Sequence, residues 1–208
     1  MRAIEVFFQV SRGFVAALFL ITSPVAIAAD VTAVEEEWQL NLNSPNASRS
    51  SPQLNCMIST IGVSESYYTI LLINQNAFGG GGLELQLWNG LVMLDSSGLG
   101  TFASLATADE KIQWTTRMEL DSNGLLKVQI LNGTSTTWGK FGGKSNLLVS
   151  TQTTLANLNT YDPNITANSS GVEFGNQRVN KLILRKVRVY TNNKKSIEQA
   201  VDRVVFEN

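Results

Sequence analysis

The chain of 208 residues contains no histidine and a single cysteine, Cys56. Without histidine there is no Ser–His–Asp triad, no imidazole general base and no metal site with a histidine ligand. A single cysteine cannot form an intramolecular disulfide or a zinc site built from several thiolates. Cys56 shares its alternation phase with Leu54 and Ile58, which predicts a buried apolar thiol.

Charge is also scarce, because only 16% of the residues are Asp, Glu, Lys or Arg, against about a quarter in an average globular domain. Lys+Arg 16 and Asp+Glu 17 give a formal net charge of −1, so the chain lacks the basic surface of a nucleic-acid-binding protein. The apolar share of 43% is ordinary and predicts a folded domain with a real core.

No apolar run approaches the roughly 20 residues that a membrane-spanning helix needs. The longest N-terminal run, residues 14–21, follows Arg2 and Arg12 and precedes an Ala-x-Ala step. These are the three parts of a signal peptide. We expect residues 1–29 to be removed by cleavage near Ala28 or Ala29. Residues 30–208 then form one secreted or periplasmic domain without a transmembrane segment.

From residue 30 onward, short stretches rich in β-branched and aromatic residues alternate with Gly, Asn, Asp and Ser clusters, which predicts strands and turns. At the C-terminus Ile197, Val201 and Val204 have helical spacing behind Ser196, so a short helix is expected there. A strand through residues 204–206 is the alternative. The other expected strands are 36–42, 54–63, 67–74, 83–88, 91–95, 112–120, 125–131, 146–153, 171–175 and 179–191.

Two hairpins can be predicted with their registers. In residues 112–131 the apolar residues occupy even positions, and a three-residue loop that ends at Gly124 pairs Leu120 with Leu126 and Glu119 with Lys127. In residues 83–95 the Asn-Gly turn at residues 89–90 predicts Trp88 opposite Leu91. Leu83, Leu85, Leu87, Val92 and Leu94 would then face the core.

The strand of residues 179–190 changes phase along its length. Leu182 and Leu184 share one face, whereas Val187 and Val189 share the other. A strand returns its apolar set to the core only by gaining or losing a residue. A β-bulge is therefore predicted at residues 185–186.

Many short strands without alternating helices predict an all-β fold, a two-sheet antiparallel β-sandwich or jelly roll. The sequence GVEFG at residues 171–175, followed by a long strand that ends in VRVY at 187–190, resembles the end of concanavalin A-like (laminin G-like) jelly rolls. The sequence VQILNG at residues 128–133 resembles a hairpin of the same modules. The resemblance implies binding or hydrolysis of glycans, but fold alone does not carry function.

Carboxylate pairs for glycoside hydrolysis are not evident. The resemblance implies a Glu-x-Asp-x-x-Glu pattern on one strand, and the sequence lacks it. Residues 35–37 are consecutive glutamates that alternate faces at the start of the mature chain, where solvated side chains are expected. Glu119 and Asp121 share a face about 7 Å apart. Because Lys127 faces Glu119 and Asp121 begins a turn, structural roles are expected and an enzyme is not favoured.

Calcium is the cofactor that the resemblance implies. The turns at residues 95–98 and 121–124, and Asp162 with Asn164, carry suitable oxygen atoms. Each is also an ordinary turn sequence, and no glutamate follows at the spacing of a bidentate ligand. We therefore expect no metal and no other cofactor.

The four tryptophans divide by phase. Trp38 and Trp114 alternate with apolar residues and are expected in the core. Trp88 lies off the core phase, and Trp138 lies in a glycine-rich stretch. The alternative for these two is burial under a neighbouring segment.

Off-phase aromatics predict an exported, non-catalytic, lectin-like module that binds a polysaccharide or another glycan. Its ligand-binding residues would be Trp88 and Trp138 as stacking platforms, with Gln86 and Met93 beside them. One alternative is a structural or partner-binding surface protein in which the face with Trp88, Leu91 and Met93 contacts another chain. A less favoured one is a glycoside hydrolase or lyase of the same fold.

Overall fold

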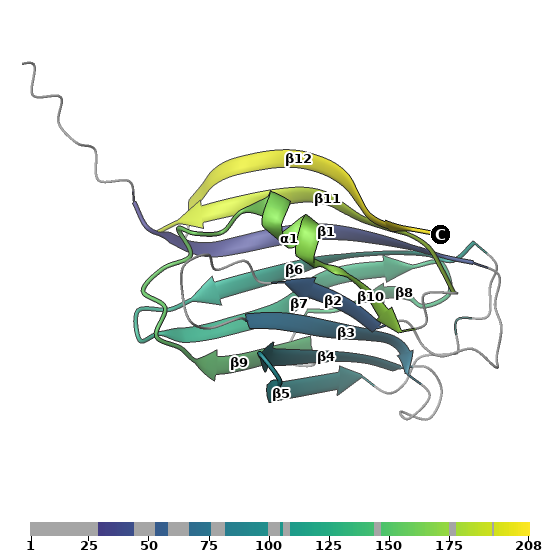
Figure 1. The fold of residues 1–208 in the computed structure, drawn as a ribbon, viewed down its shortest axis with the longest axis horizontal. Coiled ribbons are helices and arrows are strands. Elements are labelled where there is room, and N and C mark those ends of the chain that lie inside the picture. The colour runs from purple at the N-terminus through teal and green to yellow at the C-terminus, as the bar shows by residue number, and fades with distance from the viewer. Residues whose placement is uncertain are drawn as a thin grey trace, which may run out of the picture.

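The computed structural model describes residues 29–43, 53–57, 67–75, 82–99, 105, 109–143, 147–174, 178–192 and 194–208. These residues form twelve strands and one short helix (Figure 1). The elements are β1 (Val31–Leu42), β2 (Gln53–Met57), β3 (Tyr67–Gln75), β4 (Gly82–Asn89), β5 (Val92–Leu99), β6 (Lys111–Leu120), β7 (Leu125–Ser135), β8 (Gly139–Phe141), β9 (Leu148–Gln152), α1 (Pro163–Ser169), β10 (Gly171–Phe174), β11 (Val179–Thr191) and β12 (Lys194–Glu207).

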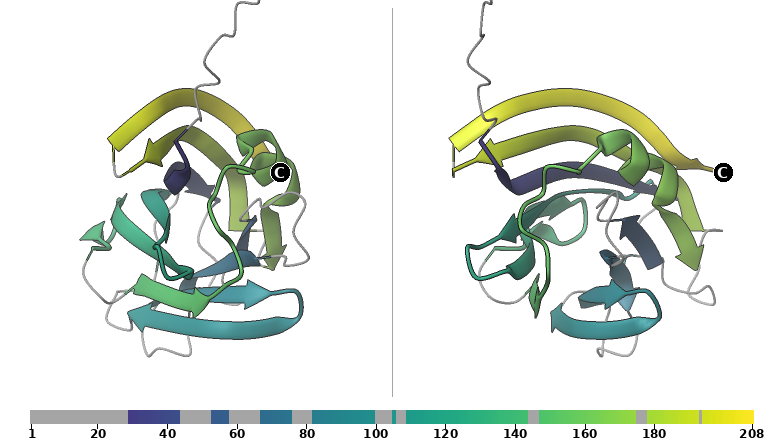
Figure 2. Two further views of the ribbon diagram at one scale, coloured as in Figure 1. Left: turned by 90° about the vertical axis from the view of Figure 1, so that its left-hand side faces the viewer. Right: turned by 60° about the vertical axis from the view of Figure 1, so that its left-hand side comes forward.

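The strands form two antiparallel sheets, so the prediction of an all-β sandwich is confirmed. Sheet A has seven strands in the order β12-β11-β1-β6-β7-β8, and β9 also pairs with β7. Sheet B has five strands in the order β10-β2-β3-β4-β5. Strands β11 and β12 arch over the molecule (Figure 2). The first strand of the chain therefore lies in the middle of sheet A, between β11 and β6.

The core lies between the sheets and follows the alternation of the sequence. Trp38 and Trp114 pair across β1 and β6, and their rings stack with centroids 6.4 Å apart. Both are buried, as their phase predicted. The expected strand around Tyr67 is β3, which lies in the interior of sheet B between β2 and β4.

The hairpin of β6 and β7 has the predicted register. Leu120 pairs with Leu126 and Glu119 with Lys127. The turn closes through two hydrogen bonds, from the Asp121 amide to the Leu125 carbonyl at 3.1 Å and from the Gly124 amide to the Asp121 carbonyl at 3.1 Å. Gly124 has a φ of +77°, a left-handed conformation that favours glycine.

The predicted register of the β4–β5 hairpin is wrong. Asn89 pairs with Val92 and Trp88 with Met93, so the two-residue loop is Gly90-Leu91 rather than Asn89-Gly90. Gly90 alone of the loop pair has a positive φ, +57°, which is the pattern of a type II′ turn. Val92 is 61% exposed because β5 is an edge strand whose tip does not face the core. The structure likewise exposes Leu94, which was also expected in the core.

The predicted β-bulge in β11 is confirmed. Lys186 pairs with Glu37 and Leu184 with Trp38, so Arg185 is the extra residue opposite β1. Both Leu184 and Val187 are buried as a result. The bulge returns the second half of β11 to the core phase.

The C-terminal segment is the strand β12, so the expected C-terminal helix is wrong. Ile197 is 56% exposed and Val204 is 42% exposed, because β12 is the edge of sheet A. The helix lies instead at α1, where the side chain of Asp162 accepts a hydrogen bond from the Asn164 amide and Pro163 is the first helical residue. An Asp-Pro step is a helix-start signal, so the sequence held this information.

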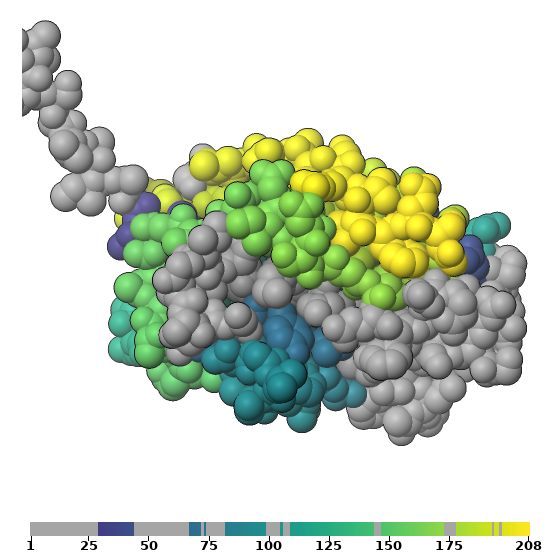
Figure 3. Space-filling model, in the orientation of Figure 1, coloured from purple at the N-terminus to yellow at the C-terminus, as the bar shows by residue number. Residues whose placement is uncertain are grey.

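A segment with little regular structure, residues 153–170, leads from β9 in sheet A through α1 to β10 in sheet B. We call this segment the strap. The Leu158 amide donates to the Val31 carbonyl at 2.8 Å, and the amide groups of Asn157 and Asn159 donate to Asp30. Helix α1 contacts β12, and the two lie side by side on the face shown in Figure 3. The strap thus ties both sheets to the start of β1.

Two predictions fall outside the described residues, namely the signal peptide within residues 1–28 and the side chain of Cys56. Over the part of the chain that is described, no helix is long and apolar enough to cross a membrane.

Candidate functional site

The outer face of sheet A, turned away from sheet B, carries a polar pocket of about 220 Å³. Strands β1, β6, β7 and β11 contribute to it. Because the inward positions of these strands fill the core, their outward positions carry polar side chains. The lining residues are Glu37, Trp38, Gln113, Trp114, Thr115, Asn132, Gly133, Thr134 and Arg185.

A bulge in β7 brings Asn132 and Thr134 to this face. Ile130 pairs with Thr116 and Asn132 with Thr115, so Leu131 is an extra residue. Up to Ile130 the even positions of β7 are buried, but beyond the bulge Asn132 and Thr134 are exposed. The bulge therefore exchanges the faces of the last five residues of β7.

Gln39, which is buried, holds two lining residues of the pocket, Gln113 and Arg185, through hydrogen bonds. The Oε1 atom of Gln39 accepts from Gln113 Nε2 at 3.3 Å and from Arg185 Nε and Nη2 at 3.1 and 2.8 Å. Arg185 Nη1 also donates to Asp202 Oδ1 at 2.8 Å. These bonds fix the guanidinium group beside the pocket.

Four polar groups at the pocket keep hydrogen-bonding capacity that no described residue uses. Asn132 accepts from the Thr115 hydroxyl at 3.2 Å through Oδ1, which leaves its side-chain nitrogen, Nδ2, as a donor. The side-chain carbonyl oxygen of Gln113 and the second carboxylate oxygen of Glu37 remain as acceptors. The Thr134 hydroxyl can both donate and accept.

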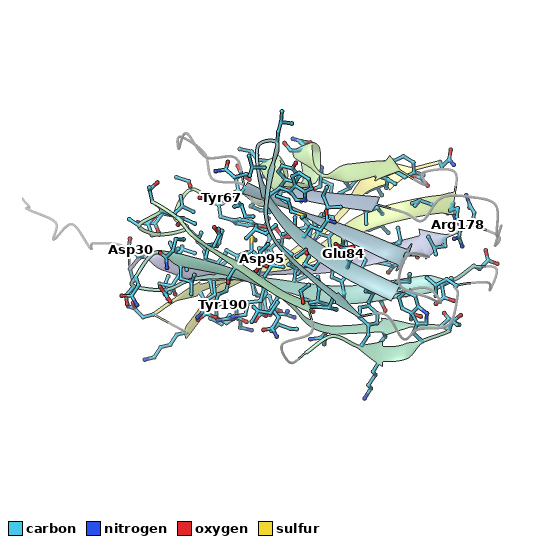
Figure 4. The ribbon with its side chains drawn as sticks, turned by 90° about the horizontal axis from the view of Figure 1, so that it is seen from below. Asp30, Tyr67, Glu84, Asp95, Arg178 and Tyr190 are labelled. Carbon is cyan, nitrogen blue, oxygen red and sulfur yellow. The ribbon has the colours of Figure 1, made fainter. Side chains whose placement is uncertain are left out.

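A charged network continues from the pocket toward the start of β1. Arg117 donates to Glu35 at 2.9 Å and to Glu119 at 3.0 Å, and the Tyr190 hydroxyl donates to Glu35 at 2.7 Å. Burial and the bond to Glu35 raise the pKa of Tyr190. Tyr190 lies at the same end of the sandwich as Asp30, and Arg178 lies at the other end (Figure 4).

Arg188 links this network to the pocket and to β12. It donates to Glu37 and, through Nε at 2.8 Å, to Glu198. Hydrogen bonds from Lys195 and Arg188 lower the pKa of Glu198 to about 2. The Arg188 guanidinium group is thus held between the carboxyl groups of Glu37 and Glu198.

Glu36 is a buried carboxyl group that points into the core and is only 2% exposed. The Tyr161 hydroxyl donates to its Oε1 at 2.7 Å, and Trp38 Nε1 donates to its Oε2 at 3.0 Å. Burial raises the pKa of Glu36 to about 7, against the opposing effect of these two bonds. The expectation of solvated glutamates at residues 35–37 is wrong for Glu36, since the strap covers it.

The residues predicted to bind a ligand do not form one site. Trp88, Gln86 and Met93 lie together on sheet B, whereas Trp138 lies in the turn between β7 and β8 of sheet A. The Trp88 ring stacks on Tyr68 with centroids 6.1 Å apart, and its Nε1 donates to Gln86 at 3.0 Å.

Trp138 does not stand free of the core either. Its ring meets Phe141 edge-on with centroids 6.0 Å apart and packs against the buried cluster. In the glycine-rich stretch the indole ring of Trp138 therefore packs against the sandwich and does not project into solvent.

The aspartates of the candidate calcium turns hold backbone amides. Asp121 Oδ1 accepts from the Asn123 and Leu125 amides at 2.8 and 3.1 Å. Asp95 accepts from the Ser96 amide and, across the sandwich, from the Ser150 amide, both at 2.9 Å. No group of three or more Asp, Glu, His or Cys residues that could hold a metal occurs within the described ranges.

Sequence reasoning missed the pocket residues and Glu36. For Glu36 a signal existed, because it shares the even phase of Val34 and Trp38. For Asn132 the signal was hidden, since the bulge at Leu131 follows no visible break in the pattern. Gln113 and Arg185 lie 72 positions apart and meet only through strand pairing.

No protein-family model matches the chain, and no curated protein is similar to it in sequence. Among solved structures it is similar to a scytalido-glutamic peptidase with a transition state analog inhibitor, at TM-score 0.35 and 12% identity over 83% of this chain and 82% of the other. A second complex, with a peptide-based analog, gives TM-score 0.35 and 13% identity over 85% and 83%. SCP-B, an eqolisin peptidase in complex with the tripeptide Ala-Ile-His, gives TM-score 0.29 and 13% identity over 85% and 82%.

The predicted lectin-like function is wrong. In this chain the two proposed sugar platforms lie on different sheets, and each ring already packs on a neighbouring aromatic. Gln86, expected to bind sugar hydroxyls, instead accepts from Trp88 and donates to Glu84 Oε1 at 2.9 Å.

Proposed function

We propose that the protein binds an extended peptide segment in the pocket on the outer face of sheet A. The observation that carries this proposal is the set of unused donors and acceptors that line one pocket. A peptide backbone presents N–H donors and C=O acceptors in turn. The Asn132 amide nitrogen and the Thr134 hydroxyl suit its carbonyl groups, and Gln113 and Glu37 suit its N–H groups.

The size of the pocket supports a ligand of one or two residues at its centre. Its volume of about 220 Å³ lies below the several hundred cubic ångströms of drug-sized sites. A longer peptide would extend over the polar face on either side. Toward the start of β1 it would meet Glu37 and then the network of Arg188 and Glu35.

The absence of an aromatic platform favours a peptide over a sugar. Trp38 and Trp114 line the pocket, but their side chains are 1% and 2% exposed and point into the core. Sugar sites use the flat faces of exposed rings, which the described lining does not offer. Charged and amide groups fixed by neighbouring residues suit peptide groups and charged side chains.

Binding is tested by titrating the isotope-labelled protein with a pool of capped tetrapeptides and recording amide NMR spectra. The side-chain NH₂ signals of Gln113 and Asn132 should shift with peptide and should remain unchanged with cellotetraose. Gln113→Leu and Asn132→Leu should each weaken binding by about fivefold, since one lost hydrogen bond corresponds to roughly 1 kcal/mol.

The matched control is Gln152→Leu, because Gln152 is exposed on β9, away from the pocket. It should leave peptide binding unchanged. The proposal is wrong if millimolar peptide shifts neither NH₂ signal, or if Gln152→Leu weakens binding as much as Gln113→Leu.

Export of residues 30–208 and a concanavalin A-like relationship stay predictions. They rest on the N-terminal pattern of residues 1–29 and on the strand endings described above. Neither enters the peptide-binding proposal.

A further inference from the structure

The strap is held to the start of sheet A by hydrogen bonds at three residues, Asp30, Val31 and Glu36. Asp30 accepts from the amide groups of Asn157 and Asn159 at 3.1 and 2.8 Å. The Leu158 amide donates to the Val31 carbonyl. At the third place the Tyr161 hydroxyl donates to Glu36, which is itself buried in the core.

Glu36 faces few groups that could stabilise a negative charge. On the neighbouring strands, Thr116 of β6 and Val187 of β11 pair with it, and both are uncharged. Its neighbours in the chain, Glu35 and Glu37, point to the outer face. From the strap come Tyr161 and, one residue further, Asp162; burial, then Glu36 and to a smaller extent Asp162 raise the pKa of Tyr161.

Within the described residues, therefore, no cation lies against Glu36. Its carboxylate has two hydrogen bonds, from Tyr161 and Trp38, in place of a full water shell. A buried charge with so few partners is costly. Release of the strap would return the carboxylate to water.

We propose that protonation of Glu36 closes the strap onto β1 and that ionisation of Glu36 releases it. The neutral carboxyl group is retained in the core with Tyr161 and Trp38. The carboxylate favours an open form in which residues 153–170 have separated from β1 and Glu36 is hydrated. Acidification then tightens the connection between the two sheets.

The pH range follows from the two states of Glu36. Its pKa is about 7 in the closed form and 4.5 as an ordinary carboxyl group in the open form. Since the closed form binds the proton more tightly, opening is independent of pH below 4.5. Opening then rises about tenfold per pH unit up to 7 and levels off above 7.

Hydrogen exchange of the full chain tests the proposal, because protection factors remove the intrinsic pH dependence of exchange. From pH 5 to pH 7 the protection of the Leu158 amide should fall by about 40-fold, because the slope is less than tenfold per unit close to each of the two pKa values. Amides of the β6–β7 hairpin serve as the reference and should keep their protection. A parallel loss in both regions would mean global unfolding and would overturn the proposal.

Two variants separate this role of Glu36 from simple packing. Glu36→Gln should keep the strap closed and abolish the pH dependence of Leu158 protection. Tyr161→Phe keeps the ring but removes a donor to the carboxylate, so the loss of protection should level off at a higher pH. An unchanged pH profile in either variant would contradict the proposal, and peptide binding is not needed for any of these measurements.

Discussion

At Gly133 the sandwich has no room for a side chain larger than a hydrogen atom. Gly133 lies on the inner face of β7 opposite Phe141 of β8. A Cβ atom at this position would lie 2.2 Å from two carbons of the Phe141 ring. Since the ring is buried in the core, it cannot move away without loss of packing.

Gly133→Ala should therefore lower the free energy of unfolding by about 1–3 kcal/mol, the usual cost of overpacking. The measurement is the midpoint of urea denaturation. Gly171→Ala is the control, because a Cβ at Gly171 meets no atom within 4 Å. An equal midpoint for both variants would show that Phe141 has room to move.

At the scale of elements, the extra residue in β11 decides which side chains reach the core. Arg185 is the residue that has no counterpart on β1. Without it, Val187 would move from the core to the outer face, since a shift of one residue exchanges the faces of a strand. The bulge also places the Arg185 side chain at the pocket.

Deletion of Arg185 should cost at least about 2 kcal/mol of stability, the contribution of burying one valine side chain. Arg185→Ala keeps the bulge and removes two hydrogen bonds to Gln39 and an ion pair with Asp202, whose side chain is 62% exposed. Such an exposed pair contributes about 0–1 kcal/mol. The midpoint of thermal denaturation should be lower for the deletion than for the substitution. Equal midpoints would show that the extra residue in β11 is not needed to place Val187 in the core.

At the scale of the whole molecule, Asp95 joins the two sheets along one side. Its Oδ2 atom, on β5 of sheet B, accepts from the Ser150 amide on β9 of sheet A at 2.9 Å. An edge strand of each sheet lies at this contact. The carboxylate accepts a hydrogen bond from the Ser150 amide, a backbone donor that has no partner strand on that side among the described strands.

Asp95→Ala should destabilise the protein by about 1–2 kcal/mol, because the Ser150 amide loses its acceptor. Asp95→Asn retains a carbonyl oxygen and should lose less. Exchange of the Ser150 amide should accelerate in the alanine variant more than in the asparagine variant. If Ser150 exchanges equally in both variants and the wild type, Asp95 does not close the sandwich.

The sequence by itself determined those features that follow from the alternation of apolar and polar residues on strands with one buried face. The β6–β7 register, the core positions of Trp38 and Trp114 and the bulge at Arg185 all follow from apolar residues that must face one side. The β4–β5 register did not follow, because β5 is an exposed edge and no buried face constrains its phase.

Only the tertiary structure decided where chemistry could occur. Glu36 looks like one of three solvated glutamates until Tyr161, 125 positions later in the chain, covers it. The pocket likewise requires β1, β6, β7 and β11 to lie side by side, which depends on pairings between distant segments. Local patterns fix which face a residue occupies, whereas long-range strand pairing fixes its neighbours, and a binding site is made by neighbours.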